Sequence, residues 1–529
     1  MGLDLDSYGL AQHPDRPQIP GPVQDVAGVF APILAETPDA VALVDSRGRY
    51  TFAQLEVRVE AAARALHGLG VTPGQRVAAC TPNHAELIVA FLASQRLGAI
   101  WVGINQPLAP PEKRYLLEDA EVALFLGSLE MVAQVKGIAA QMRTLCVAPG
   151  QTGDEWEDAL AGAPPTRPAY QVDPFAPAAI AYTSGTTGFP KGAVHSQHNL
   201  VLLGAVARAE GYYPPEMPHG VMLPLTTLNL MALVPLHTLQ NGACCVVIDR
   251  GKPVELAGWV ERERIGHFTA VPAIYHDLLS HPEVRVDSLR SLRQPEMGGA
   301  NIPPAIRALY RRRLDRDICV GYGMTEAPTT VTRTQPSARF EAGLCGHPLP
   351  QYRLDIVDED GASLAVGEVG EVVISAARSG HFAGVYTPML GYWKRPDATR
   401  AALRGGRYHS GDLGRLDAQG QLFIMGRSKE LIIRGGANVY PAEVERVLHA
   451  CKGVAAAAVV GKECTRLGER VVAFVQCDAG QVFDPEALRH ACEQALARYK
   501  VPEEFHPVRS MPRNAMGKIV KDRLLPVQT

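Results

Sequence analysis

The stretch Ala181-Tyr-Thr-Ser-Gly-Thr-Thr-Gly-Phe-Pro-Lys-Gly192 follows an apolar, strand-like run over Ala178–Tyr182. Between residues 183 and 188 it holds two glycines, three threonines and one serine, and Lys191 follows. A backbone of this composition can curl closely around an anion, with its N–H groups and hydroxyls directed inward and the lysine adding positive charge. The stretch therefore predicts a phosphate-binding loop, although a surface turn rich in Ser, Thr and Gly would have the same composition.

The spacing of this stretch excludes two other known loops. A nucleotide-binding loop of the Walker type needs G-x-x-x-x-G-K-[ST], whereas Gly185, Gly188 and Lys191 follow the order G-x-x-G-x-x-K. The hydrolase turn G-x-S-x-G is excluded as well, because position 182 is Tyr. The sequence therefore predicts a phosphate loop of another kind.

The composition of the 529-residue chain narrows the class of protein. Apolar residues make up 47% and charged residues 20%, so a large core can form and global disorder is excluded. The formal net charge of −3 excludes a general polyanion-binding surface, and we expect no nucleic-acid partner. The ten cysteines are scattered without a C-x-x-C pair, which favours reduced thiols and a cytoplasmic location.

The order of helix-like and strand-like segments predicts an α/β protein. The helix-like Gln54–Leu69 and Ala85–Leu97 are followed by the strand-like Arg76–Ala79 and Ile100–Val102, an alternation typical of parallel sheets. Residues 221–248 carry no charged side chain, but proline, asparagine and glycine interrupt them. We therefore expect a core helix and a strand there rather than a membrane span.

The pattern of predicted strands and helices changes twice toward the end of the sequence. From Leu354 onward, short strands separated by turns indicate a β-rich subdomain over about residues 345–427. After Gly426, a run of about 100 residues alternates strands and helices, which is enough for one small domain. We predict a large domain over residues 1–427, made of layered α/β subdomains and the β-rich subdomain, and a small, mobile α+β domain over residues 428–529.

Four later motifs accompany the loop. They are Gly321-Tyr-Gly-Met-Thr-Glu326, Tyr408-His-Ser-Gly-Asp-Leu413, Gly426-Arg-Ser-Lys-Glu-Leu-Ile432 with Gly435-Gly-Ala-Asn-Val-Tyr-Pro441, and Asn514-Ala-Met-Gly-Lys518. With the loop they resemble, in order and spacing over about residues 40–525, the motifs of the adenylate-forming superfamily. This superfamily comprises acyl- and aryl-CoA synthetases, nonribosomal-peptide adenylation domains and firefly-type luciferases. The chain is most similar to a stand-alone acyl- or aryl-CoA ligase.

The resemblance implies an ATP-dependent acid–thiol ligase, an AMP-forming acyl-CoA synthetase, that works in two half-reactions. A carboxylate first attacks the α-phosphorus of ATP, which gives an acyl-AMP and pyrophosphate. The thiol of coenzyme A then attacks the acyl carbon and expels AMP. ATP, Mg²⁺ and coenzyme A are the implied cofactors and co-substrates, and catalysis would rest mainly on positioning and charge neutralisation.

By the same resemblance, three motifs and one backbone edge bind ATP and AMP. The loop would hold the β- and γ-phosphates, while Thr325 would contact the α-phosphate and Glu326 would be the metal ligand for Mg²⁺, which prefers hard oxygen ligands. Tyr322 would stack on adenine, and Asp412 would accept both ribose hydroxyls. The implied ATP- and AMP-binding residues are Thr183, Ser184, Gly185, Thr186, Thr187, Gly188, Lys191, Gly299, Ala300, Asn301, Tyr322, Gly323, Met324, Asp412 and Arg427.

The hinge block and the terminal motif assign three roles to the small domain. Lys518 is the implied catalytic lysine, because an ammonium can bridge the substrate carboxylate and the α-phosphate as charge develops. Lys429 matches the hinge about which the small domain turns between the half-reactions. Gly435 and Gly436 would line the coenzyme A tunnel, since their missing side chains let a thin ligand pass. The implied catalytic residues are Lys518, Thr325 and Glu326.

The acyl pocket departs from the family pattern. Many relatives place an aromatic–His pair after a Leu-Pro-Leu run, whereas Thr226 and Thr227 follow Leu223-Pro-Leu225 here. Thr227 could hydrogen-bond to the carboxylate instead, or the site is more open. The implied lining is small, apolar and hydroxylated, which favours an aromatic, alicyclic or short-to-medium aliphatic monocarboxylate. It comprises Thr226, Thr227, Leu228, Asn229 and Ala327.

Three alternatives stay open. An acyl-AMP ligase could load the phosphopantetheine thiol of a carrier protein, and a luciferase-like oxidation would start from the same acyl-AMP. A non-catalytic nucleotide-binding protein would have lost charged motif residues, yet Lys191, Glu326, Asp412 and Lys518 are all present. The expected partner is a small carboxylic acid, and no membrane span is expected in the chain. A homodimer and a carrier-protein partner both stay possible.

Overall fold

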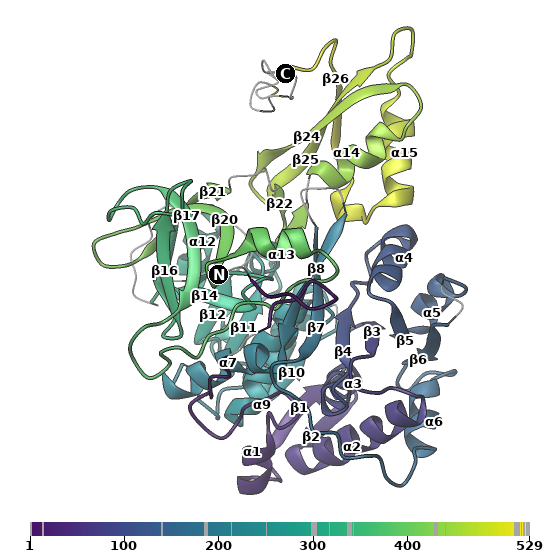
Figure 1. Cartoon of the computed structure of the whole chain (residues 1–529), viewed down its shortest axis with the longest axis vertical. Helices are drawn as coiled ribbons and strands as arrows, with labels where there is room; N and C mark the ends of the chain where they lie inside the picture. Colours follow the sequence, from purple (N-terminus) through teal and green to yellow (C-terminus); the bar gives the residue numbers. More distant parts are fainter. Residues whose placement is uncertain are drawn as a thin grey trace.

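The structure is a computed structural model. It describes residues 3–12, 15–138, 141–184, 189–212, 214–249, 251–297, 304–316, 318–335, 341, 343–427, 432–439, 441–512, 519, 521 and 524. Figure 1 shows a broad lower region and a smaller upper region that contains α15 (Pro485–Ala495). The upper region meets the lower one where α15 lies near α4 (Pro110–Asp119).

A seven-stranded sheet forms one layer of the lower region, within the residues described. Its order is β18-β8-β7-β4-β3-β5-β6. The strands β7, β4, β3, β5 and β6 pair in parallel, as the alternating pattern predicts, whereas β8 and β18 add antiparallel strands at one edge. The strands are β3 (Arg76–Cys80), β4 (Ile100–Gly103), β5 (Val122–Gly127), β6 (Arg143–Cys146), β7 (Pro177–Ser184), β8 (Pro190–Ser196) and β18 (Gly391–Tyr392).

Two predicted helices are confirmed, and local capping explains where each begins. Helix α2 (Phe52–Gly68) starts after a capping box in which the side chains of Thr51 and Gln54 exchange hydrogen bonds with each other's backbone N–H. Helix α3 (Ala85–Arg96) starts after His84, whose Nδ1 accepts the Leu87 N–H. Almost all of α3 is buried, which matches its nearly continuous apolar sequence.

A second sheet joins the α/β part to the β-rich part. Strands β1, β10, β9, β11, β12 and β13 pair in parallel, and the sheet turns antiparallel from β13 through β14, β15, β21, β20 and β17 to β16. The β-rich subdomain is therefore a continuation of the same sheet. These strands are β1 (Val41–Asp45), β2 (Gly48–Thr51), β9 (His219–Val221), β10 (Cys245–Val247), β11 (His267–Ala270), β12 (Gln294–Met297), β13 (Cys319–Met324), β14 (Thr329–Arg333), β15 (Leu344–Pro348), β16 (Tyr352–Val357), β17 (Gly370–Ala376), β20 (Arg407–Leu416) and β21 (Leu422–Arg427).

The uncharged run over residues 221–248 forms a broken helix and a strand. Helices α8 (Leu228–Met231) and α9 (His237–Asn241) flank a π-helical turn over Ala232–Leu236, which contains Pro235. Proline lacks the N–H that a regular helix needs, so the wider turn lies where the sequence interrupts the apolar run. In the described part of the chain, no helix has the length and hydropathy of a membrane span.

Among the residues described there, the upper region is a five-stranded sheet with two helices against it. Strand β24 (Val454–Cys464) pairs with β25 (Gly468–Cys477), which also contacts β22 (Ile432–Arg434) and β26 (Glu504–Pro507), and β23 (Ala437–Val439) pairs with β22. Helix α14 (Pro441–His449) and α15 pack against each other beside the sheet. The boundary between residues 427 and 428 stays a prediction, because residues 428–431 lie outside those described.

Candidate active site

The β7–β8 hairpin carries the predicted phosphate loop. Thr183 lies opposite Lys191, and Ser184 opposite Pro190, so the two strands hold the ends of the loop together. The loop follows the carboxyl end of β7, the edge at which parallel sheets bind ligands. The four loop residues between the strands lie outside the described residues, namely Gly185, Thr186, Thr187 and Gly188.

Glu326 lies between this hairpin and β18. The Thr183 hydroxyl is 3.5 Å from Glu326 Oε1, and the Tyr392 hydroxyl donates a hydrogen bond to the same oxygen at 2.9 Å. The Lys191 Nζ lies 5.3 Å from the centre of the Tyr392 ring. A carboxylate, two hydroxyls and an ammonium thus gather where the loop ends. The ammonium and hydroxyls can bind phosphate oxygens, and the carboxylate can bind a hard cation.

The donor set at Glu326 fits Mg²⁺ that is held partly by a nucleotide. Among the residues that the structure describes, no three His, Cys, Asp or Glu side chains gather as a metal site. Mg²⁺ usually keeps several waters and binds one or two carboxylates together with substrate phosphates. One carboxylate beside the hydroxyl of Thr183 meets that requirement.

Tyr322 and Asp412 form the other end of the site. The Tyr322 hydroxyl donates to Asp412 Oδ2 at 2.6 Å, and Asp412 is buried. Asp412 lies on β20 opposite Arg427 on β21, and its backbone N–H donates to the Ser410 hydroxyl. The carboxylate predicted for the ribose is therefore fixed beside the ring predicted for the adenine.

Tyr408 is a buried residue close enough to both ends for their charges to act on it. Burial, and after it the negative charge of Glu326, hold the pKa of the Tyr408 hydroxyl well above its usual value; Tyr392, Tyr322 and Asp412 act in the same direction. Tyr408 therefore stays a neutral phenol. The sequence motif at residues 408–413 contains this tyrosine, but motif comparison assigned a role only to Asp412.

Gly323 permits a close approach within the β13–β14 hairpin. A Cβ at this position would lie 1.7 Å from the carbonyl oxygen of Thr329, so no other residue fits without movement of the backbone. Thr329 itself has a φ of 88°, a conformation that is strained for a β-branched residue. The hairpin that carries Met324, Thr325 and Glu326 is therefore held in a constrained shape.

His195 holds the backbone of Thr325 by a hydrogen bond to its carbonyl oxygen. Its Nε2 lies 2.7 Å from the Thr325 carbonyl oxygen, and the Asn199 amide donates to its Nδ1 at 3.4 Å. Since a carbonyl can only accept and the amide nitrogen can only donate, the proton of the neutral ring lies on Nε2. Burial lowers the pKa of His195 to about 4, so the ring stays neutral. Sequence reasoning missed this residue, although it lies only four positions after Lys191 on β8.

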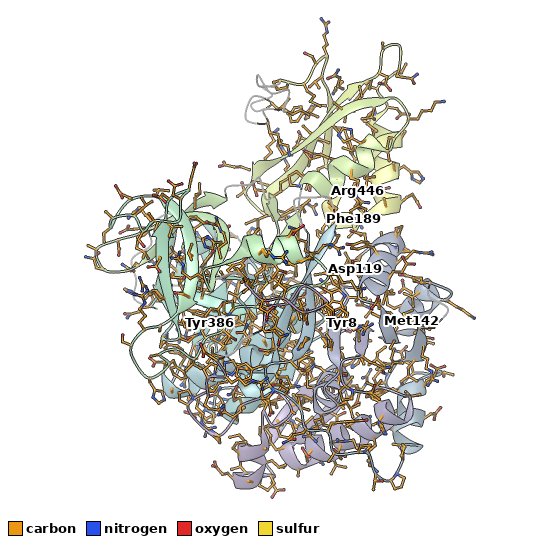
Figure 2. All side chains as sticks on the ribbon, viewed as in Figure 1. Tyr8, Asp119, Met142, Phe189, Tyr386 and Arg446 are labelled. Carbon is orange, nitrogen blue, oxygen red and sulfur yellow. The ribbon has the colours of Figure 1, made fainter. Side chains whose placement is uncertain are left out.

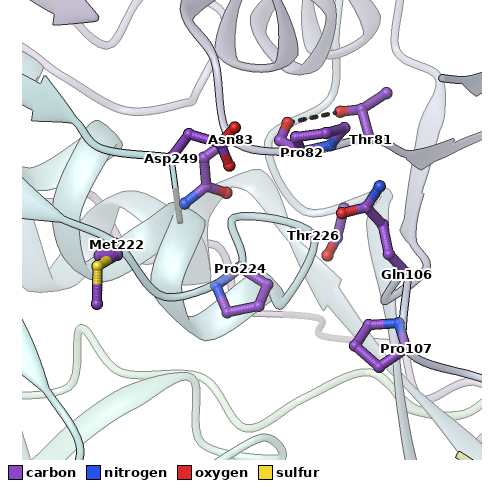
Figure 3. Close-up of a pocket in the computed structure, with 9 residues that line it drawn as sticks. All are labelled: Thr81, Pro82, Asn83, Gln106, Pro107, Met222, Pro224, Thr226 and Asp249. Atoms are coloured by element: carbon purple, nitrogen blue, oxygen red, sulfur yellow. Dashed lines mark hydrogen bonds between the residues drawn. The ribbon is translucent and has the colours of Figure 1, made fainter. Parts of the chain in front are cut away.

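Thr226 and Thr227 share an acceptor that sequence reasoning also missed. Both hydroxyls donate to Oδ1 of Asn105, at 2.6 Å and 3.3 Å. Figure 3 shows Thr226 at a polar pocket lined also by Asn83 and Gln106. The Asn83 side chain accepts the Leu225 N–H and donates to the Leu223 carbonyl, which fixes the segment before the two threonines. Leu228 and Ala327 are buried, and Asn229 is half-buried.

A turn of the upper region reaches the lower one at Val271. Gly436 lies between β22 and β23 with a φ of 83°, and a Cβ on it would lie 2.3 Å from Cγ1 of Val271. Gly435 precedes it with a φ of 58°. Val271 follows β11, so the predicted tunnel glycines border the sheet that carries the site.

Several predicted residues lie outside the described part of the chain, and their roles stay predictions. These are Gly299, Ala300, Asn301, Lys429 and Lys518, and the side chains of Ser184 and Arg427 are not described either. The described members, Thr183, Lys191, Tyr322, Thr325, Glu326 and Asp412, are brought together around one pair of hairpins.

Comparison with known proteins shows the family. The family model described as AMP-binding enzyme matches residues 30–393, and that described as AMP-binding enzyme C-terminal domain matches residues 443–518. The chain therefore belongs to the AMP-binding enzymes, within their adenylate-forming acyl-CoA ligases.

Three relatives illustrate the similarity. A feruloyl-CoA synthase from Amycolatopsis is 33% identical over 92% of this chain and 95% of its own length. An indoleacetate–CoA ligase from Aromatoleum aromaticum is 34% identical over 89% of this chain and 92% of its own. Among solved structures, an amide bond synthetase from Marinactinospora thermotolerans superposes with a TM-score of 0.83 at 30% identity, over 94% of this chain and 99% of that one.

Proposed function

We propose that the enzyme activates an aromatic monocarboxylate as its acyl-AMP and transfers the acyl group to coenzyme A. The observation that carries this proposal is the β13–β14 hairpin, which spans both ends of the site. At one end Glu326 lies 3.5 Å from Thr183 of the loop hairpin, and at the other Tyr322 lies 2.6 Å from Asp412. One rigid hairpin thus connects a phosphate and cation end to a ribose and adenine end.

In this proposal each group has a separate task toward ATP. The loop residues 183–188 and Lys191 hold the outer phosphates, and Glu326 would hold Mg²⁺, which would supply charge neutralisation there. Thr325 contacts the α-phosphate, while Asp412 and Arg427 hold the ribose. Tyr322 and the edge at residues 299–301 enclose the adenine. Lys518 enters for the first half-reaction, and the small domain turns about Lys429 before the second.

The acid is proposed to enter beside Thr226 and Thr227. Their shared bond to Asn105 Oδ1 orients two hydroxyls and one amide in the segment where many family members carry an aromatic–His pair. The described lining residues Thr226, Thr227, Leu228, Asn229 and Ala327 carry no charge, which disfavours a second carboxylate or an ammonium on the substrate. Feruloyl and indoleacetyl groups, named for two relatives, are both aromatic.

A panel of acids with ATP and coenzyme A, read by AMP release, tests the proposal. We expect cinnamate-type and arylacetate-type acids to give the highest kcat/KM. A dicarboxylate or an amino acid as the best substrate would overturn the assignment of the acid. The same assay with a phosphopantetheinyl carrier protein, and with an amine in place of the thiol, distinguishes the acceptors, and we expect coenzyme A to be the fastest.

Two further features belong to this proposal. All ten cysteines are described as free thiols, which supports a cytoplasmic location. A homodimer would show in solution by light scattering at about twice the chain mass, and catalysis as proposed here needs only one chain.

A further inference from the structure

One face of helix α4 points at the upper region. Glu112, Tyr115 and Asp119 are spaced by three and four residues, so they lie on the same side of the helix. The carboxylate of Asp119 accepts from Arg395 and from Tyr182 at 2.8 Å and 2.7 Å, which ties the helix end to the strands of the site. Glu112 and Tyr115 are the members that meet the upper region and the loop hairpin.

Phe189 is the residue at which the loop hairpin meets this face. Its ring centroid lies 5.1 Å from that of Tyr115, and the Tyr115 hydroxyl donates to the Pro190 carbonyl at 3.1 Å. From the other side, the Arg446 guanidinium of α14 lies 4.2 Å from the Phe189 ring centre. Figure 2 shows Phe189 and Arg446 next to each other at the junction of the two regions. Phe189 thus contacts both regions, although it stays 45% exposed.

A buried ion triad forms the second contact. The Lys500 Nζ lies 2.7 Å from Glu112 Oε1 of α4 and 2.8 Å from Glu443 Oε1 of α14. The side chains of Lys500, Glu112 and Glu443 are 5%, 9% and 2% exposed, so water screens the triad little. Burial raises the pKa of Glu443, while Lys500 counteracts it. Lys500 and Glu443 both belong to the upper region, so the Glu112 carboxylate supplies the interaction of this triad with the lower region. Glu112→Gln would remove that charge interaction and leave the buried Lys500–Glu443 pair in place.

In the same structure that has the Phe189–Arg446 contact and the ion triad, the turn at Gly436 lies against Val271. Arg446 and Glu443 lie on α14, which follows β23 directly, and Gly436 precedes β23. In the arrangement that these contacts hold, the turn therefore lies at Val271, where a Cβ at Gly436 would be 2.3 Å from the Val271 side chain.

We propose that Glu112, Tyr115 and Phe189 form a docking platform that seats the small domain, through Lys500 and Arg446, in the arrangement that serves thioester formation. The inference rests on the proposed function, and it assigns positioning roles to residues that the motifs left without a role. Phe189 lies within the loop motif, whereas Glu112, Tyr115, Arg446 and Lys500 lie outside all five motifs. None of the five touches the reacting atoms in this account. They act by holding the small domain so that its turn at Gly435 and Gly436 has the orientation needed for thioester formation.

The test measures the two half-reactions separately in the full-length enzyme. Acid-dependent ATP–pyrophosphate exchange reports the first, and AMP release from purified acyl-AMP plus coenzyme A reports the second. We expect Phe189→Leu and Arg446→Ala each to slow the second half about threefold to fivefold, and Glu112→Gln about tenfold, with the first half unchanged or faster. The double variant of Phe189 and Arg446 should be no slower than the slower single variant, because both remove one contact.

Matched controls separate positioning from stability. Arg415→Ala removes an Arg–Phe contact of 4.1 Å to Phe423, within the lower region, and Glu118→Gln changes an exposed carboxylate on α4 itself. Neither should alter the ratio of the two rates. Equal losses in both half-reactions, or no loss in the second, would overturn the platform. A wild-type enzyme that releases no AMP with any acid would instead overturn the proposed function.

Discussion

The Tyr322 hydroxyl donates a hydrogen bond of 2.6 Å to Asp412 Oδ2, across 90 positions of the sequence. Tyr322 belongs to β13 and Asp412 to β20, and the second sheet brings the two strands into the same antiparallel part. Two motifs that were assigned to adenine and to ribose independently are thus joined by one direct contact, which holds the tyrosine ring in register with the carboxylate.

This pair predicts how ATP affinity responds to mutation. Asp412→Asn should raise the KM for ATP about tenfold or more, because a charge-assisted acceptor is lost. Tyr322→Phe keeps the ring and should raise the KM about threefold. Asp417→Asn, which alters a surface turn, is the control and should leave the KM unchanged. The assignment fails if Asp412→Asn binds ATP as the wild type does.

Glu326→Gln should slow adenylation about 100-fold and raise the Mg²⁺ concentration needed for half-maximal exchange. The amide keeps the size of the side chain but loses its charge, so the effect reports the cation. Tyr392→Phe removes the 2.9 Å hydrogen bond to Glu326 and should slow adenylation about threefold. Exchange that is unchanged at limiting Mg²⁺ in the glutamine variant would speak against a metal at this carboxylate.

Lys518→Ala should lose adenylation by about 100-fold or more, whereas thioester formation from supplied acyl-AMP should survive. The reason is that the ammonium is needed only while charge develops at the α-phosphate. Lys521→Ala is the matched control, because Lys521 pairs with Glu445 at 2.7 Å within the small domain. Equal loss of both half-reactions in the Lys518 variant would refute this division of labour.

The threonine pair predicts a selective effect on the acid. Thr227→Val and Asn105→Ala should raise the KM for the carboxylic acid about threefold and about tenfold, since Asn105 is the common acceptor of both hydroxyls. The KM for ATP should not change. Thr144→Val, at an exposed position of β6, should change neither constant. A shift in the KM for ATP alone would place the pair elsewhere than at the acid.

His195 predicts a pH dependence of stability. Its pKa is lowered from 6.5 to about 4 by burial, so the unfolded chain binds the proton more tightly than the folded enzyme. The free energy of unfolding should therefore fall as the pH drops from about 6.5 toward 4, by ~2 kcal/mol at pH 5 for this one group. His195→Gln, whose amide can still donate to Thr325, should show a correspondingly smaller loss between pH 8 and pH 5 in urea unfolding.

Other buried histidines also lower the stability at acidic pH, so the test compares the pH-dependent loss of the wild type with that of the His195 variant. The pKa of His84 is lowered to about 3 by burial, and it acts in both proteins alike, so its effect cancels. An equal pH-dependent loss in the wild type and in the His195 variant would show that the imidazole is accessible or paired differently.

The sequence by itself determined the chemistry-bearing motifs, the α/β class and several of the helices and strands. Strand β7 (Pro177–Ser184) contains the predicted run Ala178–Tyr182 and extends two residues beyond it, and α2 and α3 lie within two residues of the predicted helices. These features depend on neighbours a few positions apart, namely hydrophobic periodicity, capping residues and glycine-rich turns, which a linear sequence displays directly. The small domain was predictable for the same reason, since its strands and helices alternate over a short run.

Only the tertiary structure decided which residues support the motifs. Tyr392 reaches Glu326 across 66 positions, His195 reaches Thr325 across 130, and Lys500 reaches Glu112 across 388. No local pattern marks such partners, because each contact exists only once two sheets and the small domain have packed. The continuity of the β-rich subdomain with the parallel sheet was likewise decided by strand pairing over long separations, and pairing of that kind follows from the burial of whole layers rather than from any short stretch of sequence.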